Sequence, residues 1–462
     1  MPTLDLPRQS NPGRHGADGA ARLINCAPED RGAEGKSNFG LYASDGLKLF
    51  STLEGGGEMR GMIVSGASLY VVSGRQVFKV DEGGGAQALG PFTSSGRVYM
   101  AVNLKATPQI IMVGSGVRGL IENDVVIGLI DTDLKPSNSV AFINQRFVHT
   151  ISSGNGQFQW SAISEGTDYN ALDFATAEYA PDGLVRAVTR QSELLLFGPQ
   201  TIEPWYTPET GNAMFARSGS VVTRGCVAGA SVELIGDTPI FVADDATVRA
   251  LEGYQAVRIS NHAVERAIRD TSDRGALDAF TYEKDGHSYY VLSGTDFTWS
   301  YDLTTKSWVE RKSYALPRWR ACCAARFAGE IIVGDFAANR LYQIDADTFD
   351  ENGDPLVMEA HIPVHAFPRK VRLDELRIDT IPGVGTGTLD PLVTVKLSNN
   401  GGKTFGNERQ VPMGKVGEYF KQVRLNRLGT SNEDGFVVAV SSSAAVVRAI
   451  VSASAEFQIM GN

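Results

Sequence analysis

The sequence predicts an all-β protein, built as a six- or seven-bladed β-propeller with an additional β-sandwich, or platform, domain. A hairpin pattern recurs along the chain, and its copies begin 37 to 49 residues apart, as expected of propeller blades of roughly 40–50 residues. The 50 glycines gather in pairs or beside Ser, Asn and Asp, as hairpin turns require. After residue 355 the pattern changes to longer alternating strands, which are typical of a sandwich.

The clearest copy of the hairpin occupies Ser288–Arg311. An apolar run at 290–292 meets a Ser-Gly turn, and Trp299 and Tyr301 then alternate with polar residues along a second strand. Side chains at alternate positions of a strand share one face, so this pattern predicts a sheet that is buried on that face. The other copies cover 69–81, 109–122, 146–161, 193–205, 239–252 and 330–345. Together the copies place the propeller at residues 61–350.

The flanking segments complete the predicted domain organisation. Residues 1–20 are rich in Pro, Gly, Arg and Asp without periodicity, which indicates an extended N-terminal arm. Residues 21–60 hold only short strands, and short hairpins need further strands for stability, so we expect them to join the C-terminal platform. That platform is the domain 356–462. Its predicted strands include 393–397, 420–425, 436–440 and 445–451.

One helix is expected to interrupt the repeats. An apolar stripe between Ala263 and Ile268 predicts a helix over 261–270. Ser260 is the expected N-cap, because a serine hydroxyl can accept a hydrogen bond from a first-turn amide.

Composition and charge restrict the class of protein. The net charge is −10 and the pI is about 5.3. This acidic balance argues against a surface that grips nucleic acid through its phosphates, but it suits a channel through which DNA slides. No apolar stretch reaches the ~18 residues of a membrane helix, and the N-terminus lacks the layout of a secretory signal, so we expect a soluble protein made in a cytoplasm. The cysteines have no C-x-x-C spacing and are expected to be reduced. They are Cys26, Cys226, Cys322 and Cys323.

The motifs of common enzyme classes are not found in the sequence. No serine has glycine at both −2 and +2, which excludes the nucleophile elbow of serine hydrolases. Gly35-Lys36-Ser37 resembles the end of a phosphate-binding loop, but Asp30 stands where that motif needs glycine. We therefore predict no catalytic residues, no cofactor and no enzymatic activity.

Two groups of residues have some features of metal sites. His361 and His365 have i, i+4 spacing, but Pro363 favours an extended segment and no third ligand is nearby. The acidic stretch 345–354 lacks the Gly at position six and the Glu at position twelve of a calcium loop. We interpret the histidines as a strand-surface pair and the acidic stretch as a solvated turn, with calcium as the weaker alternative. The prediction is that the chain has no metal site.

Two further patterns lie in the C-terminal region. Ser398–Phe405 resembles the Asp-box hairpin of sialidases and related propellers, with Asn400 in place of Asp and Phe405 in place of Trp. In those proteins the box is a folding turn remote from catalysis, so it predicts a hairpin. Basic residues also alternate at 369–372 and 421–427. We interpret them as solvated edges that resist strand pairing, with an intersubunit or channel-facing surface as the alternative. Interface residues stay unassigned.

A series of landmarks follows the repeats in order. They are Arg60-Gly61 before 69–74, Leu172–Glu178 before Pro181-Asp182, Leu196–Gly198 with Ile202–Trp205, Gly253-Tyr254 with Arg258–Ser260, Gly286–Leu292, Thr298–Asp302 and Trp308–Arg311. In order and spacing they resemble the packaged-DNA stabilisation proteins of short-tailed phages, the tail nozzle or hub. The resemblance covers residues 22–345. Two departures are Ser300, where we expect Cys, and a C-terminal region in which the resemblance provides no landmarks.

This resemblance implies a non-enzymatic protein of the phage tail, made in the cytoplasm of the host bacterium and incorporated into the virion. It implies a homo-oligomer, most simply a hexamer, that forms a ring below the portal and adaptor. Such a ring continues the DNA channel, retains packaged DNA until ejection, and supports distal tail parts such as fibre, spike or needle proteins. Double-stranded DNA would pass through the ring without sequence-specific binding.

A carbohydrate-binding or glycan-active propeller is the alternative from another class. The Asp-box-like hairpin suggests it, as do five tryptophans that could stack on sugars. These are Trp160, Trp205, Trp299, Trp308 and Trp319. Most of them alternate along predicted strands, which favours packing within the blades. Arginines and carboxylates gathered at the central mouth of the propeller would favour the glycan alternative, whereas a ring with a pore of DNA width would favour the phage protein.

Overall fold

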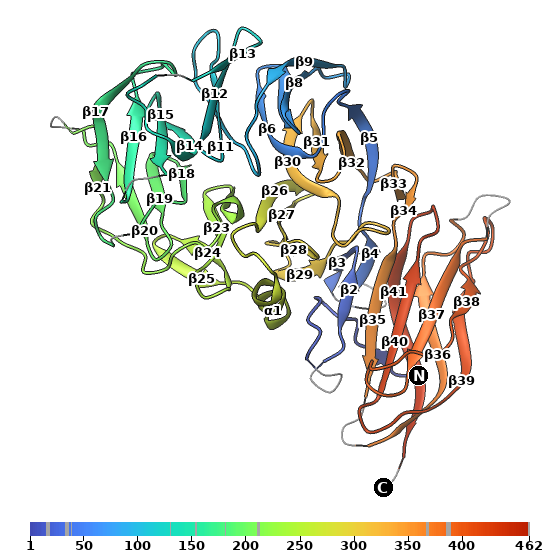
Figure 1. The fold of residues 1–462 in the computed structure, drawn as a ribbon. Helices are drawn as coiled ribbons and strands as arrows, with labels where there is room; N and C mark the ends of the chain where they lie inside the picture. Colours follow the sequence, from blue (N-terminus) through green and yellow to red (C-terminus); the bar gives the residue numbers. More distant parts are fainter. Residues whose placement is uncertain are drawn as a thin grey trace.

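The computed structural model describes residues 1–14, 19–32, 37, 39–129, 131–152, 155–180, 182–209, 213–365, 369–384 and 390–460. Gly35 and Lys36 of the segment that resembles a phosphate-binding loop lie outside the described residues, as do Pro181 and part of the N-terminal arm. The described residues form a β-propeller joined to a β-sandwich (Figure 1). The predicted fold class is therefore confirmed.

The propeller has seven four-stranded blades, numbered in chain order from residue 59. Blades 1 and 2 comprise β6 (Met59–Ser65), β7 (Ser68–Ser73), β8 (Gln76–Val80), β9 (Ala86–Pro91), β10 (Tyr99–Val102), β11 (Ile110–Gly114), β12 (Val117–Glu122) and β13 (Val125–Gly128). Blades 3 and 4 comprise β14 (Ser137–Ile143), β15 (Arg146–Ile151), β16 (Gln157–Ser161), β17 (Tyr169–Thr176), β18 (Arg186–Arg190), β19 (Glu193–Phe197), β20 (Ile202–Tyr206) and β21 (Ala216–Arg217).

The remaining blades follow the same order of strands. Blade 5 comprises β22 (Glu233–Ile235), β23 (Thr238–Val242), β24 (Val248–Glu252) and β25 (Gln255–Arg258), preceded by the short 3-10 helix η3 (Gly229–Ser231). Blades 6 and 7 comprise β26 (Asp278–Lys284), β27 (His287–Ser293), β28 (Thr298–Asp302), β29 (Ser307–Glu310), β30 (Ala321–Phe327), β31 (Glu330–Asp335), β32 (Arg340–Asp345) and, from the N-terminal side of the chain, β5 (Gly46–Thr52).

The recurring hairpins of the sequence are the second and third strands of each blade. These strands are largely buried, because neighbouring blades cover both faces of each sheet. The first strands β6, β10, β14 and β18 lie beside one another in turn, as do β22, β26 and β30, and β30 lies beside β6, so the first strands surround the propeller axis. Their ends therefore bring residues from distant repeats together at the centre.

The N-terminal strand β5 closes the ring. It pairs antiparallel with β32, with Leu47 opposite Ile344, and so supplies the outer strand of blade 7 (Figure 1). Residues 46–52 lie within the range 21–60 that we expected to join the platform, so that expectation was wrong for this strand. The physical reason is that closure removes the free edge that three-stranded blade 7 would otherwise expose. Residues 350–355 extend the same sheet as β33 (Asp350–Glu351) and β34 (Asp354–Pro355).

The sandwich combines both ends of the chain in two sheets. One sheet has the order β3-β4-β41-β36-β39, with β1 on β41, and the other continues as β2-β35-β40-β37-β38. Their bounds are β1 (Thr3–Leu4), β2 (Arg22–Ile24), β3 (Cys26–Asp30), β4 (Phe39–Ala43), β35 (Met358–Val364), β36 (Val371–Thr380), β37 (Leu392–Ser398), β38 (Arg409–Pro412), β39 (Val423–Thr430), β40 (Phe436–Ser442) and β41 (Ala449–Ile459). Leu23 and Leu41 are fully buried in the same core as residues of β36 and β40.

The two domains share one sheet. Strand β29 of blade 6 lies parallel to β2, and β2 pairs with β35 of the sandwich, so that nine strands run without a break from β26 to β38. Arg22 holds this junction through two hydrogen bonds to Glu310, from Nε at 2.9 Å and from Nη2 at 2.7 Å. The Asn25 amide donates to the carbonyls of Lys312 and Val357. Such continuous pairing disfavours free rotation of one domain against the other.

The N-terminal arm and the helix meet on blade 6. Helix α1 (His262–Asp270) begins after Asn261, whose side chain accepts hydrogen bonds from the amides of Ala263 and Val264. Asn261 is therefore the N-cap, and the expectation of Ser260 was wrong. The Ser260 hydroxyl instead donates to the Glu265 carboxylate at 2.8 Å. The arm lies against this region, because Asn261 Nδ2 donates to the Ser10 carbonyl at 3.0 Å.

Candidate functional site

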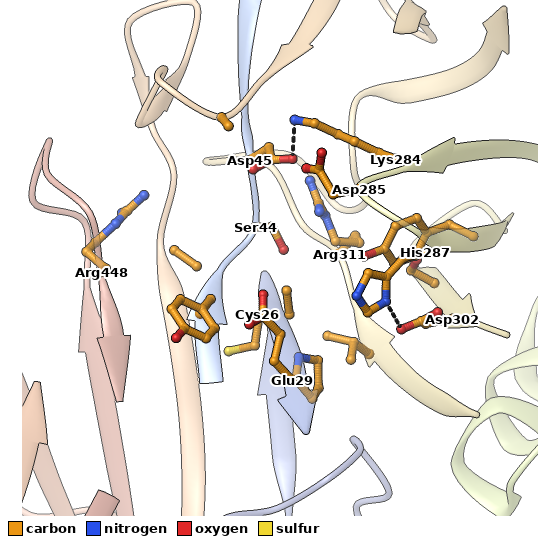
Figure 2. A pocket seen from close by; sticks show the side chains of 18 of the residues that line it. Cys26, Glu29, Ser44, Asp45, Lys284, Asp285, His287, Asp302, Arg311 and Arg448 are labelled. Atoms are coloured by element: carbon orange, nitrogen blue, oxygen red, sulfur yellow. Dashed lines mark hydrogen bonds and ion pairs between the residues drawn. The ribbon is translucent and has the colours of Figure 1, made fainter. Parts of the chain in front are cut away.

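A cavity of about 250 Å³ lies between blade 6 and the sandwich. Figure 2 shows the residues that line it, with His287 and Asp302 from the propeller and Cys26 and Arg448 from the sandwich. Because its walls come from segments far apart in the sequence, the cavity exists only once the two domains have joined.

The His287–Asp302 pair is the most suggestive feature of this cavity. His287 Nδ1 lies 2.8 Å from Asp302 Oδ2 (Figure 2). This is the hydrogen-bonding distance found where a carboxylate orients a histidine that acts as a general base. The same carboxylate accepts hydrogen bonds from the Thr304 amide and the Thr305 hydroxyl, so it organises the turn between β28 and β29. Among the described residues, no serine hydroxyl makes a hydrogen bond to His287. The pair therefore lacks a nucleophile and is explained by blade folding.

The sandwich wall of the cavity is also structural. Arg448 donates to the carbonyls of Leu356 and Phe349, the latter at 3.2 Å, and thereby ties the segment between the domains to β41. Burial lowers the pKa of Arg448 to about 10. Burial raises the pKa of the Cys26 thiol to about 12, so this thiol is protonated and a poor nucleophile at neutral pH.

A second cavity, of about 510 Å³, lies at the mouth of the propeller where the first strands begin. Arginines and carboxylates line it, including Arg60, Arg97, Arg318 and Asp278. Arg60 donates to the carbonyls of Gly96 and Gly74, and Arg318 is ion-paired with Asp278 at 2.9 Å. These two guanidiniums thus brace the loops at the mouth. The sequence patterns did not identify this cluster, although a charged residue at the start of several first strands was a visible signal.

The tryptophans do not form a sugar-stacking surface. Each of the five is at most 8% exposed, because Trp160 and Trp205 pack in one blade core and Trp299 and Trp308 in another. Trp319 is fully buried and donates from Nε1 to the Glu351 carboxylate at 2.9 Å.

The structure places the two groups that resemble metal sites in strands and turns. His361 lies in β35 and pairs with Glu359, with 2.6 Å between Nε2 and Oε1. In the acidic stretch, Asp345 and Asp350 accept hydrogen bonds from residues of their own turns. Within the described parts of the chain, no group of three or more His, Cys, Asp or Glu side chains is arranged to hold a metal ion.

The Asp-box-like segment forms a compact loop between β37 and β38, which pair as a hairpin. Asn400 Oδ1 accepts from the Ser398 hydroxyl at 2.7 Å and from the Thr404 amide at 2.9 Å. Asparagine can therefore replace the aspartate of the box, since its amide oxygen supplies the same acceptor.

The basic alternation lies on β36 and on β39, an edge strand of the sandwich. Arg372 pairs with Asp374 at 2.9 Å, and Arg424 donates to Gln422 at 2.9 Å. These local pairs suit the solvated edge expected of β39. Strand β36 pairs with β39 on one side and β41 on the other, so the expectation of an edge was wrong for 369–372. The predicted strand at 420–425 begins only at Val423, and Phe420 is fully exposed before it.

Comparisons with known proteins agree with this architecture. A family described as Bacteriophage P22 Gp10, beta-propeller, matches residues 20–349, and one described as Bacteriophage P22 Gp10, beta-sandwich, matches residues 364–456. No curated protein matches the chain. Among the part of the chain that the structure describes, no helix is long and apolar enough to cross a membrane.

Solved propellers are similar to the chain only at low identity. The WD40 domain of Pan2 from Neurospora crassa is 9% identical, with 65% of this chain and 95% of that chain covered and a TM-score of 0.41. The propeller domain of Cps50 (Swd1) from Myceliophteria thermophila is 11% identical, with 64% and 98% covered and a TM-score of 0.43. The assignment therefore rests on the two family matches, which follow one another along the chain in the order propeller, sandwich: the chain belongs to the Bacteriophage P22 Gp10 family of phage structural proteins.

Proposed function

We propose that the chain is the nozzle, or hub, of a phage tail: a non-enzymatic ring, most simply a hexamer, below the portal and adaptor. In this role it continues the DNA channel, retains packaged DNA until ejection, and supports distal fibre, spike or needle proteins. The observation that carries the proposal is the match of both domains, in order, to one phage structural family.

The junction between the domains suits a subunit that must withstand mechanical force. A nine-stranded sheet runs from blade 6 into the sandwich, and the Arg22–Glu310 pair holds together the two strands that join the domains, β2 and β29. A subunit that resists the pressure of packaged DNA must not bend between its contacts with the adaptor and with its neighbours. A shared sheet provides such stiffness, because bending would break the pairing of Ile24 with Glu310 together with the hydrogen bonds that Arg22 and Asn25 make across the junction.

Exposed apolar side chains support a closed ring. A cyclic assembly uses two different patches of each chain, which meet head to tail. On β17, Leu172 is 81% exposed, and in the loop between β38 and β39, Tyr419 is 62% and Phe420 is 100% exposed. These two regions lie at opposite ends of the molecule (Figure 1), as a ring interface requires. We propose that they take part in subunit contacts.

The charge of the chain bears on assembly and on DNA passage. Six chains at −10 each would carry −60, and like charges repel over the Debye length of about 8–10 Å at moderate salt. Ring closure should therefore strengthen with salt or on the portal–adaptor template. The same negative balance keeps adhesion to the phosphates of passing DNA low.

Sedimentation tests the ring directly. The purified chain is compared at about 50 mM and about 500 mM NaCl, with and without the portal–adaptor complex, and the sedimenting species are imaged by negative-stain electron microscopy. We expect a ring with a pore of DNA width, formed more fully at high salt or on the complex. A chain that remains monomeric at every salt concentration and does not bind the complex would refute the nozzle proposal.

Surface variants test the proposed contacts separately. Leu172→Ser and Phe420→Ser should each weaken ring formation without lowering the melting temperature, because both side chains are exposed. Leu104→Ser is the matched control, since this leucine is 83% exposed outside both regions. Normal ring formation by both variants would assign the subunit contacts to another surface while leaving the ring itself intact.

One observation favours the glycan alternative, because arginines and carboxylates do gather at the central mouth of the propeller. Their side chains are largely engaged with the protein itself, and the buried tryptophans offer no stacking surface. Binding to a glycan array, measured for the wild-type chain and for Arg318→Gln, decides between the nozzle and the glycan-binding function. Saturable glycan binding that this variant abolishes would support the alternative, whereas we expect none.

A further inference from the structure

A small group of charged side chains lies at the propeller axis behind the mouth. Arg97 directly precedes β10, while Arg186 and Glu233 begin β18 and β22. They come from blades 2, 4 and 5, so only the closed propeller brings them together. Arg97 Nη2 lies 3.5 Å from Glu233 Oε1, and Arg97 Nη1 donates to the Cys322 carbonyl at 2.9 Å. The negative charge of Glu233 is thus already used to compensate the positive charge of Arg97.

Arg186 has a different environment. Its guanidinium carbon lies 3.9 Å from the centre of the Tyr99 ring, a cation–π contact that satisfies no N–H group. The Nε and Nη1 atoms of Arg186 are buried and have no hydrogen-bond partner among the described residues. Arg97 repels this group and burial desolvates it, and burial is the larger cause of its lowered pKa. Two guanidiniums therefore share one carboxylate, which leaves one positive charge uncompensated.

Buried N–H groups without partners are uncommon, because each loses its hydrogen bonds to water without replacement. A charged donor in this position requires an acceptor, and an anion satisfies both its hydrogen-bonding capacity and its charge. Arg60 at the same mouth provides the contrast, since it donates from Nε and Nη1 to carbonyls and from Nη2 to the Ser94 hydroxyl. Arg318 is intermediate, because its Nη1 donates to Asp278 whereas its Nε has no partner among the described residues.

The cavity at the mouth offers a route to this position. It is about 510 Å³ in volume and is lined by Arg97, Tyr99 and Gly229, among others. A Cβ atom at Gly229 would lie 2.7 Å from the Val185 carbonyl oxygen and 3.2 Å from the Tyr99 hydroxyl. Glycine therefore lets the η3 segment approach the residues that flank Arg186. Arg186 is not among the residues that line this cavity, and it is reached only past Tyr99, whose ring it contacts. A ligand beside Arg186 must therefore be small.

We propose that a small inorganic anion, of halide to phosphate size, binds at the propeller axis between Arg186 and Arg97 and neutralises the excess charge. It links blades 2, 4 and 5 and stabilises the closed ring of blades. The inference is independent of the nozzle proposal, since a monomeric propeller would bind the anion equally well.

Bromide is the probe. Crystals of the full chain, grown without halide and soaked in bromide, should show one anomalous peak within hydrogen-bonding distance of Arg186. Thermal unfolding is followed in parallel as bromide or phosphate is raised at constant ionic strength, with a sulfonate buffer anion as the counter-salt. For the wild-type chain, the midpoint temperature of unfolding should rise with the anion concentration and reach a plateau.

Three variants complete the test. Arg186→Gln should abolish both the peak and the saturable rise, and Arg372→Gln, which removes the same charge from the exposed sandwich surface, should change neither. Glu233→Gln should lower the half-saturating bromide concentration at least about tenfold, because it removes the competing negative charge. No bromide peak in the wild-type crystals would overturn the proposal. An undiminished peak in Arg186→Gln, or a site that takes N-acetylneuraminate but not bromide, would overturn it as well.

Discussion

Replacement of His149 should remove a large part of the acid sensitivity of blade 3. This histidine lies in β15 and is fully buried. Its Nδ1 atom lies 3.2 Å from the Ser137 hydroxyl, and its Nε2 atom lies 2.9 Å from the Tyr169 hydroxyl. Burial, with repulsion from Arg118, lowers the pKa of His149 from 6.5 to about 3. The folded chain therefore keeps the ring neutral at pH values where the unfolded chain protonates it.

The sign and size of the effect follow from proton linkage. Below the unfolded pKa of about 6.5, only the unfolded state gains the proton, so stability falls by about 1.4 kcal/mol for each pH unit until the folded pKa is reached. Between pH 7 and pH 4.5 the contribution of His149 is about 2.7 kcal/mol. This value changes little if the folded pKa lies a unit above or below 3, because pH 4.5 remains above it.

The assay compares the wild-type chain with His149→Gln, whose amide can bond to both neighbouring hydroxyls but does not titrate. Urea unfolding at pH 7 and pH 4.5 is followed by hydrogen exchange of peptides from β14 to β16, so that it reports on blade 3. His262→Gln is the control, since its side chain is 83% exposed on α1. Between pH 7 and pH 4.5, the unfolding free energy of the variant should fall by about 2.7 kcal/mol less than that of the wild type. Equal losses in both chains would refute the reasoning.

Three other changes test the packing. Trp299→Ala should cost roughly 3–5 kcal/mol of unfolding free energy, because Trp299 is 4% exposed in a core shared by blades 5 and 6; an unchanged melting temperature would contradict this. Leu47→Ala should cost about 2–5 kcal/mol and loosen β32 in hydrogen exchange before β36, since Leu47 is fully buried in the closing strand; loss of protection in β36 first would place β5 with the sandwich. The four free cysteines should react with Ellman's reagent only after unfolding, because all four side chains are buried and burial also raises the pKa of Cys26 and Cys226 to about 12; rapid labelling of the native chain would show an accessible thiol.

The blade hairpins could be predicted from the sequence because they are local. Each joins strands that are neighbours in the chain, and the alternation of buried residues with a glycine at the turn records both the face and the register. Gly74, for example, has a φ of 56° between β7 and β8, a conformation that favours glycine. The same reasoning identified the Asn400 turn and the short N-terminal strands.

The helix cap shows how two adjacent candidates limit such prediction. Ser260 and Asn261 are both good N-cap residues, and propensity does not separate them. The tertiary structure decided between them, because the Val248 amide donates to the Ser260 hydroxyl at 3.0 Å and that hydroxyl donates to Glu265. The Asn261 side chain therefore accepts the hydrogen bonds from the amides of the first turn.

By itself the sequence determined the all-β class, the blade repeats and the presence of a second β domain, since these depend on patterns within one or two strands. Only the tertiary structure decided that β5 closes blade 7, that β2 joins the two domains into one sheet, and that Arg97, Arg186 and Glu233 meet at the axis. Each of these contacts joins residues that are far apart in the chain. Strands pair through backbone groups that every residue carries, so the side-chain pattern does not show which distant strands pair. A charged residue at the start of a strand has the sequence pattern of a solvated residue, and only the closed propeller shows that it is buried.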